Sequence, residues 1–160
     1  MRGTLDGRPV ALAGYHDHNW GFWEGVRWQW GQVAHDDLSF VYGRVFPPPA
    51  VAEADRVPGF LGVLGPDGVL GVATRVSIAE RGEDAGGRSA PREVEIAAKG
   101  VDLDLRLQFT VESSIRTPFG LSGSEIPLDF LQLAGTYRVS GRAAGRPIDF
   151  SGRGAAETFR

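Results

Sequence analysis

Residues 101–111 alternate apolar and polar side chains without interruption, in the order Val-Asp-Leu-Asp-Leu-Arg-Leu-Gln-Phe-Thr-Val. Successive side chains of a β-strand point to opposite faces of a sheet, so this period of two predicts a strand with one buried and one solvated face. Such half-buried strands are typical of antiparallel sheets. The face predicted to be buried carries Val101, Leu103, Leu105, Leu107, Phe109 and Val111.

The same pattern divides most of the chain into short strands. A partner strand that carries Val94 and Ile96 precedes Lys99-Gly100, where we expect a hairpin turn. Pro66-Asp67-Gly68 and Ala144-Gly145-Arg146 predict two more tight turns, because Gly tolerates the positive φ that such turns need. Further strands are expected at residues 10–14, 27–35, 38–46, 59–65, 69–80, 130–141 and 146–158.

Helical patterns are scarce, and the only expected helix is a turn or two around residues 50–55, after three prolines. Polar, Gly-rich segments at 81–91 and 118–127 predict loops. Eight or nine short strands favour an all-β fold, with one domain over residues 1–160 that forms a single antiparallel up-and-down β-barrel or a strongly curved sheet. Periodicity alone does not separate a barrel from a sandwich, but a barrel of about eight strands can enclose one small ligand.

Charge and composition disfavour several classes of protein. The formal net charge is −3, and acidic and basic residues are interspersed. Nucleic acid is therefore not an expected partner, because neutralising phosphates requires clustered Lys and Arg. The chain has no Cys, which excludes disulfides and thiolate metal sites and fits a reducing compartment. Without a long apolar run or a signal-like start, we expect no membrane span and a cytoplasmic location.

Residues 14–21 hold the densest chemistry of the chain, in the order Gly-Tyr-His-Asp-His-Asn-Trp-Gly. If this octet is extended, Tyr15, Asp17 and Asn19 point to one side. The other side carries two of the three histidines of the chain, His16 and His18, together with Trp20. Groups that exchange protons matter most where they are aimed together into a cavity, so the octet is the candidate active site.

The octet resembles the Gly-Tyr-x-Asp-His-Asn-Trp-Gly motif of the carotenoid 1,2-hydratases (hydroxyneurosporene synthases) and of the related lipocalin-like Diels-Alderases. A Trp-x-Trp-Gly follows the motif in that superfamily, and residues 28–31 match it here as Trp-Gln-Trp-Gly. Segments 7–10 and 145–157 resemble the beginning and end of the same domain. The resemblance implies a lipocalin-like (calycin-type) barrel that corresponds only to the second domain of two-domain relatives.

Asp17 is the expected general acid. In the carotenoid hydratases the matching Asp is proposed to protonate a terminal carbon–carbon double bond, after which water captures the cation, and the matching Tyr assists, so the resemblance assigns these roles to Asp17 and Tyr15. An ordinary Asp with a pKa of about 3.9 is ionised at pH 7, so a proton-donating Asp17 requires an apolar pocket. The alternative is a structural Asp that accepts backbone hydrogen bonds or pairs with an Arg.

All four tryptophans lie within residues 20–30. Together they can form an apolar wall and stabilise a developing cation through their ring faces. Large aromatic residues on strands also serve simply as core, so packing alone is the alternative. The expected substrate-binding set is His16, His18, Asn19, Trp20, Trp23, Trp28 and Trp30.

A metal site is a weaker interpretation of the same segment. His16 and His18 project together from a strand, and imidazole binds Zn, Cu, Fe and Ni. A third ligand would have to come from residues 35–37, His-Asp-Asp, which instead read as a polar hairpin turn. We expect no metal and no cofactor, and the chain carries none of the common motifs of serine hydrolases, nucleotide-binding proteins or metalloproteases.

Two functions follow from these observations. The first is a cofactor-independent hydratase, isomerase or cyclase that acts on a hydrophobic isoprenoid or polyketide-like molecule by Asp general-acid catalysis. The second is a non-catalytic, lipocalin-like binding module for an apolar small molecule. Because the resemblance covers one domain of two, we also expect a homodimer in which a second copy replaces the other domain.

Overall fold

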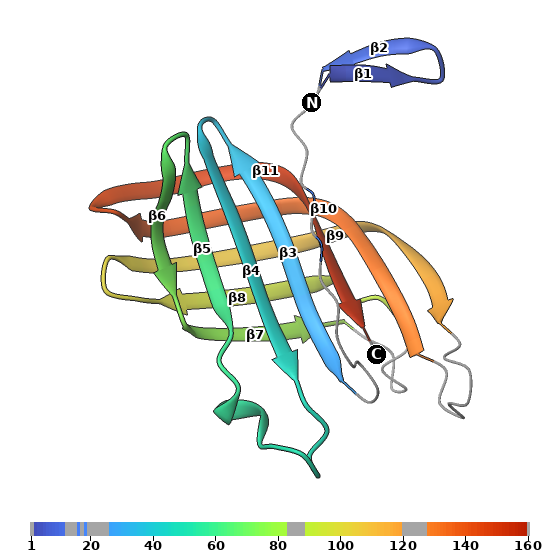
Figure 1. Ribbon diagram of the computed structural model, residues 1–160, viewed down its shortest axis with the longest axis vertical. Helices are drawn as coiled ribbons and strands as arrows, with labels where there is room; N and C mark the ends of the chain where they lie inside the picture. Colours follow the sequence, from blue (N-terminus) through green and yellow to red (C-terminus); the bar gives the residue numbers. More distant parts are fainter. Residues whose placement is uncertain are drawn as a thin grey trace.

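The computed structural model describes residues 2–11, 16, 18, 26–82, 89–119 and 128–159. These residues are almost entirely β-structure, and the one helical element among them is the 3-10 turn η1 (Ala54–Arg56). The first two strands, β1 (Arg2–Leu5) and β2 (Arg8–Ala11), form a hairpin that is separate from the main sheet (Figure 1). The described part of the chain holds no helix long and apolar enough to cross a membrane.

The other nine strands form one antiparallel sheet in the order β6-β5-β4-β3-β11-β10-β9-β8-β7. Strands β3 to β6 form a meander, β7 to β11 form a second meander, and β11 pairs with β3 to join the two. Figure 1 shows β3–β6 crossing in front of β7–β11. The strands are β3 (Arg27–His35), β4 (Leu38–Phe46), β5 (Phe60–Gly65), β6 (Gly68–Ala73), β7 (Arg75–Arg81), β8 (Glu93–Lys99), β9 (Leu103–Phe119), β10 (Leu128–Ala143) and β11 (Arg146–Phe159).

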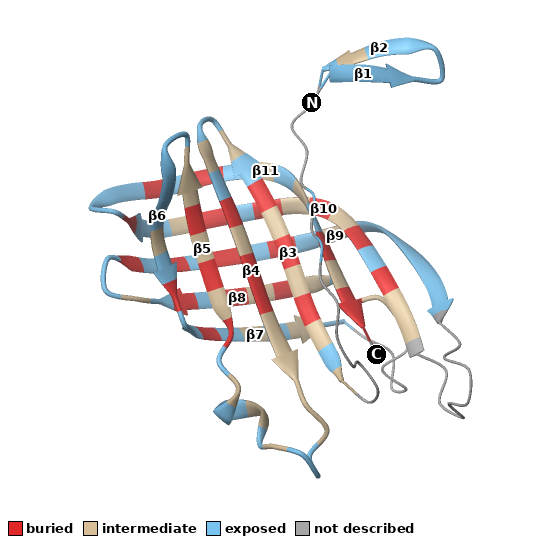
Figure 2. Ribbon diagram, viewed as in Figure 1, coloured by how far each residue is buried: buried red, intermediate tan, exposed pale blue. Residues whose placement is uncertain are grey.

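The core lies between the two meanders, because most of their strands turn apolar side chains inward. Alternating burial along the strands is visible in Figure 2. Phe40 and Tyr42 from β4 and Phe109 and Tyr137 from β9 and β10 are fully buried at its centre. Buried apolar area is the main favourable term in folding, so this central layer holds the two meanders together.

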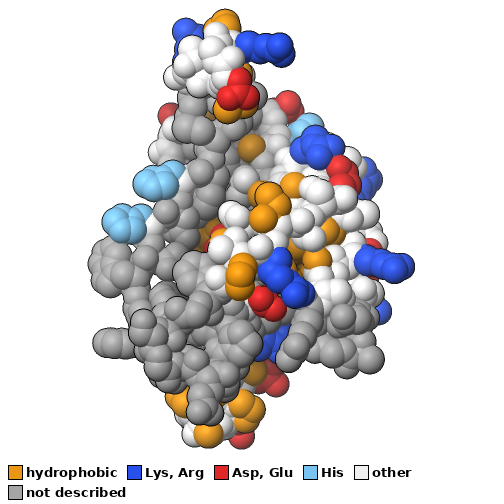
Figure 3. All heavy atoms as spheres, turned by 90° about the vertical axis from the view of Figure 1, so that its right-hand side faces the viewer, with side chains coloured by type: hydrophobic (Ala, Val, Ile, Leu, Met, Phe, Trp, Pro, Cys, Tyr) orange, Lys and Arg blue, Asp and Glu red, His pale blue; other side chains and the backbone are white. Residues whose placement is uncertain are grey.

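Acidic and basic side chains mix on the solvated faces of the strands. Arg81 pairs with Glu95 (2.9 Å), Lys99 with Asp104 (3.5 Å), and Arg138 with Asp149. The face drawn in Figure 3 also shows charges of both signs interspersed with apolar side chains over its described residues. Exposed pairs of this kind add little stability. The described part of the face in Figure 3 carries no patch of one charge sign.

Most strand predictions are confirmed. The strands at 27–35 and 38–46 have the predicted bounds, and turns lie at 66–67, 100–102 and 144–145 as expected. Gly68 has φ +131° and Gly145 has φ +75°, the positive values that make Gly suitable there. The helix expected around 50–55 is only η1. Of the strand expected at 10–14, residues 10 and 11 belong to β2 (8–11), and residues 12–14 lie outside the described residues. Residues 83–88 of the first predicted loop and 120–127 of the second lie outside the described residues.

Two sequence predictions are wrong in detail. Val101 does not join the buried face: it lies in the turn before β9 and is 99% exposed. The strand expected at 69–80 is divided at Thr74 into β6, which pairs with β5, and β7, which pairs with β8. The chain therefore passes from one meander to the other at Thr74, so a continuous apolar pattern spans two strands that run in different directions.

Candidate functional site

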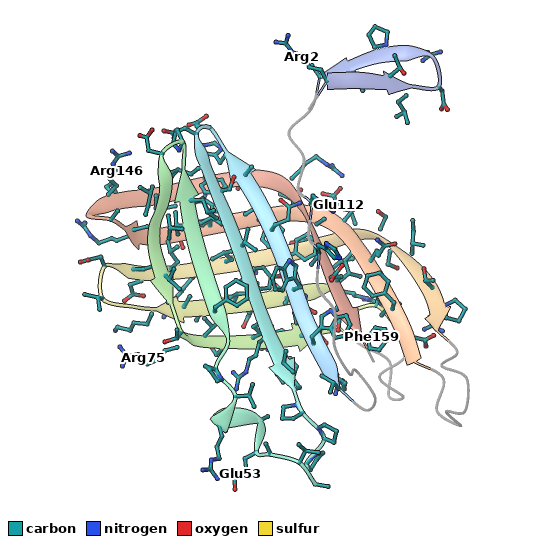
Figure 4. All side chains as sticks on the ribbon, in the orientation of Figure 1. Arg2, Glu53, Arg75, Glu112, Arg146 and Phe159 are labelled. Carbon is teal, nitrogen blue, oxygen red and sulfur yellow. The ribbon has the colours of Figure 1, made fainter. Side chains whose placement is uncertain are left out.

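A pocket of about 420 Å³ lies at one end of the sheet, where β3 and β7 come together. Pockets of 300–1,000 Å³ with mostly apolar walls are typical of small-molecule sites. Figure 4 shows the labelled Phe159 at this end of β11 and Glu53 on the segment beyond β4. The pocket is lined by Arg27, Trp28, Gln29, Phe46, Pro47, Pro48, Pro49, Ala54, Ile78, Glu80 and Thr158.

Polar side chains enter this pocket from the core-facing side of three strands. Gln29 and Thr158 are register partners on β3 and β11, and both are buried. Glu80 shares the inward face of β7 with Val76 and Ile78, because these residues are separated by two positions. Three polar groups are thus placed at positions where the strand pattern otherwise supplies apolar core.

Gln29 is the most unusual member of this group. Its side chain is 1% exposed, yet neither its amide nitrogen nor its amide oxygen has a hydrogen-bond partner among the described residues. Burying an amide without a partner costs about 1–3 kcal/mol. Native folds rarely leave both ends of a buried amide unsatisfied, and a bound molecule that pairs with Gln29 would remove this cost.

The hydroxyls of Tyr42 and Tyr137, next to Gln29, form a chain of hydrogen bonds that runs in one direction. The hydroxyl oxygens of Tyr42 and Tyr137 are 3.1 Å apart, and the Tyr137 hydroxyl donates to the carbonyl oxygen of Ala155 at 3.1 Å. Because a phenol has one hydrogen to donate, Tyr42 must donate to Tyr137. The oxygen of Tyr42 is left with acceptor capacity only.

Burial keeps both tyrosines neutral. Loss of hydration raises the pKa of Tyr42 to about 12; the hydroxyl of Tyr137 and then the nearby amide of Gln29 lower that pKa, and the charge of Glu80 raises it. Loss of hydration, then Tyr42, raises the pKa of Tyr137 well above its ordinary value. Both phenols therefore stay protonated at physiological pH and keep the hydrogen bonds that join them.

Two glycines make room for this pair. A Cβ on Gly31 would lie 2.5 Å from the Tyr137 hydroxyl oxygen, and one on Gly154 would lie 2.7 Å from the Tyr137 ring. Real Cβ atoms do not approach that closely. Gly31 is the glycine of the Trp-Gln-Trp-Gly segment, so this part of the motif has a packing role beneath the tyrosines.

Arg44 binds the segment of residues 47–56, which contributes three prolines and Ala54 to the lining of the pocket. From the inward face of β4 its guanidinium donates to the Val76 carbonyl oxygen (2.9 Å), to the Ala54 carbonyl oxygen (3.2 Å) and to Asp55 (3.2 Å). Its guanidinium carbon lies 5.5 Å from the ring centre of Phe46. Arg44 therefore links β4, the η1 segment and the edge strand β7.

A larger groove, about 840 Å³, lies on the other side of Arg44. Arg56, Arg75, Lys99 and Arg106 line it together with the acidic Asp55 and Asp104. Lys99 and Asp104 pair at 3.5 Å, both with mostly exposed side chains. This groove is a charged surface channel, whereas the smaller pocket combines apolar walls with buried polar groups, and we take the smaller pocket as the candidate site.

The structure describes four of the residues expected to form the site. His16 and His18 are exposed. Trp28 lines the pocket and stacks on Phe159 at 4.4 Å between ring centres. Trp30 lies on the opposite face of β3 from Gln29 and meets Phe60 edge-on at 5.1 Å. The remaining expected residues, Tyr15, Asp17, Asn19, Trp20 and Trp23, lie outside the described residues.

The residues considered as a third metal ligand are placed at a hairpin. His35 ends β3, stacks on Phe150 at 4.2 Å and lies 3.5 Å from Asp36, whose φ is +52°. The turn at 36–37 agrees with the prediction. Within the described residues, no group of three or more His, Asp or Glu side chains is arranged to hold a metal ion.

Sequence reasoning did not identify Glu80 or the tyrosine pair, and it included Gln29 only as part of the Trp-Gln-Trp-Gly segment. The sequence did offer a signal for Gln29 and Glu80. Gln29 and Glu80 occupy inward positions of strands whose other inward residues are mainly apolar, and such local exceptions often mark functional sites. The tyrosines gave no signal because buried Tyr is common in cores.

No protein-family model matches this chain, and no curated protein matches it either.

Proposed function

We propose that this protein binds a small, mainly apolar molecule in the pocket between β3 and β7. The observation that carries the proposal is Gln29, a buried amide without a described partner that lines a pocket with apolar walls. The apolar walls would supply most of the affinity, and the few polar groups would orient the ligand. Geraniol, an acyclic isoprenoid alcohol, is a suitable probe because Trp28 in the wall can report its binding by fluorescence.

Saturable binding of geraniol with a change in tryptophan emission is the expected result. The control is Trp28→Phe, which removes the reporter and keeps an aromatic wall, so most of the signal should disappear while calorimetry still detects binding. If neither calorimetry nor fluorescence detects saturable binding of geraniol or its hydrocarbon counterpart myrcene, the binding proposal is wrong.

We propose the lipocalin-like barrel as the frame of this site. Strand order supports it: each strand from β3 to β11 pairs with its neighbour in sequence except β6 and β7, and β11 returns to β3. One residue separates β6 from β7, and these pair with β5 and β8 respectively. Residues 68–81 then act as one bent strand that joins the two meanders into an eight-stranded circuit, while the edge of β6 away from β5 stays unpaired among the described strands. Slow amide exchange through both β6 and β7 is expected, whereas fast exchange along both would contradict closure.

The second proposed function is catalysis of hydration, isomerisation or cyclisation, with Asp17 as general acid and Tyr15 assisting. It is favoured by the position of Trp28 and Gln29, which belong to the segment resembling the carotenoid hydratases and line the pocket. For geraniol, Asp17 would protonate C6 of the terminal double bond, water would add to the tertiary cation at C7, and a proton of that water would return to Asp17. The proposal needs no cofactor.

Mass spectrometry tests this chemistry, because hydration adds one water to the probe. We expect Asp17→Asn to abolish turnover and to retain geraniol binding, with Asp37→Asn in the hairpin turn as the control. Binding without turnover in the wild type would remove the catalytic proposal and leave the binding proposal intact. A variant that no longer folds would instead make Asp17 a structural residue.

Self-association is also proposed, with a second copy pairing along β6. This edge strand exposes Val69 (65%) and Val72 (53%) beside a backbone edge that no described strand pairs. Exposed apolar edges favour strand pairing between chains. Light scattering should give the mass of a dimer for the wild type and of a monomer for Val72→Lys, and a monomeric wild type would contradict the proposal.

A further inference from the structure

Gln29 can be oriented by the hydrogen bonds of its neighbour. The Tyr42 hydroxyl gives its hydrogen to Tyr137, which gives its own to the Ala155 carbonyl, so Tyr42 offers only an acceptor to any group beside it. Gln29 lies close enough to Tyr42 to lower the pKa of that phenol. No hydrogen bond joins the two side chains in the structure, but an amide can meet an acceptor only through its NH₂ group, so a Gln29 that pairs with Tyr42 keeps its oxygen for other partners.

In that orientation the oxygen of Gln29 is available to the pocket that the residue lines. Glu80 lines the same pocket, and the charge of its carboxyl raises the pKa of Tyr42. Carboxylate and amide oxygens both accept hydrogen bonds. These two side chains give the pocket two acceptors, and Arg27, the one cationic side chain among its described lining residues, is exposed at the start of β3.

We propose that Gln29 is the specificity-determining residue of this pocket and selects ligands whose head group donates a hydrogen bond, such as an alcohol, over ligands whose head group only accepts. This inference rests on the proposed binding function and adds the class of ligand. A hydroxyl group satisfies the Gln29 oxygen, whereas an aldehyde oxygen has no hydrogen to donate and leaves the Gln29 oxygen unpaired. Such unpaired buried groups are what make a polar site reject the wrong ligand.

Three probes with one isoprenoid skeleton test the inference: geraniol with a hydroxyl head, geranial with an aldehyde head, and myrcene with none. Wild-type protein should bind geraniol about tenfold more tightly than geranial, the value of one hydrogen bond of roughly 1.4 kcal/mol. In Gln29→Leu the two affinities should become equal within about twofold, while myrcene binds at least as tightly as before. Gln132→Leu, an exposed glutamine on β10, is the matched control and should keep the preference.

The outcomes separate this inference from the binding proposal. If no probe binds the wild type, the binding proposal has failed. If geraniol and geranial bind equally to the wild type, or if Gln29→Leu keeps the preference, the pocket binds ligands but Gln29 does not read the head group. Folding of Gln29→Leu is checked by circular dichroism; if it does not fold, Gln29→Met takes its place, and retention of the preference there overturns the inference.

Discussion

The hydroxyl of Tyr42 occupies the space in which a side chain at Gly31 would begin. The two residues face each other across β3 and β4, where they are register partners. Glycine at position 31 thus allows the phenol to reach Tyr137 and complete the hydrogen-bonded pair. A Gln29 amide that pairs with Tyr42 does so through its NH₂ group, which leaves the Gln29 oxygen available to the pocket.

Gly31→Ala should destabilise the protein by about 1–3 kcal/mol, because the added methyl forces the tyrosine hydroxyls apart in a closely packed core. Urea unfolding measures the loss. Gly62→Ala is the control, since its Cβ would meet nothing nearer than the Val41 carbonyl oxygen at 4.0 Å. Equal stabilities for the two variants would contradict the packing role of Gly31.

Tyr42 makes stability depend on pH in the alkaline range. Its pKa is raised from 10.0 to about 12 in the folded state, so the unfolded chain loses this proton first as pH rises. The contribution of Tyr42 to the free energy of unfolding is complete below pH 10. Between about pH 10 and 12 this contribution, roughly 2–3 kcal/mol, is lost. Urea unfolding at several pH values should show a shallower decline in Tyr42→Phe than in the wild type, and parallel declines would refute this account.

Gln29→Met should leave the stability unchanged or raise it by about 1 kcal/mol. The substitution removes a buried amide that lacks described partners and keeps a similar volume. Thermal and urea unfolding without ligand measure the effect, with the exposed Gln132→Met as the control. A loss of more than about 2 kcal/mol would mean that the amide is well satisfied in the free protein.

Arg44→Met should loosen the segment of residues 47–56. Three hydrogen bonds to Val76, Ala54 and Asp55 are lost, and the carbonyl oxygens lose a charged donor. Trypsin should then cleave after Arg56, which is exposed in η1, several-fold faster than in the wild type. Arg142→Met is the control, because Arg142 bonds only locally to Gly145 among the contacts described. Unchanged cleavage at Arg56 would show that the segment is held by its prolines.

The period-two pattern predicted the strands well where one face of a strand is buried along its full length. β3 and β4 have the predicted bounds for that reason. The pattern failed at Val101, which obeys the alternation but lies beyond the end of the sheet, and at Thr74, where the chain bends between meanders. Periodicity reports which side chains share a face, not where the backbone changes direction.

The candidate site was only partly predictable. The Trp-Gln-Trp-Gly segment drew attention to Trp28 because of its large ring, and Trp28 does line the pocket. Gln29 gained its role from Tyr42 and Tyr137, whose partners are distant in sequence. Such a role depends on the pairing of β3 with β4 and on the contact of Tyr42 with Tyr137 of β10, which a single sequence does not reveal. The proposed roles of Asp17 and Tyr15 stay predictions, since both lie outside the described residues.

The most direct measurement of the central claim is a ¹⁵N NMR titration with geraniol that follows the side-chain amide of Gln29. We predict saturable shifts of that amide together with the backbone amides of Ile78 and Thr158, while the side-chain amide of Gln132 stays in place. Saturable binding that leaves the Gln29 amide unmoved and shifts only residues on the solvated faces of the strands would contradict the assignment of this pocket.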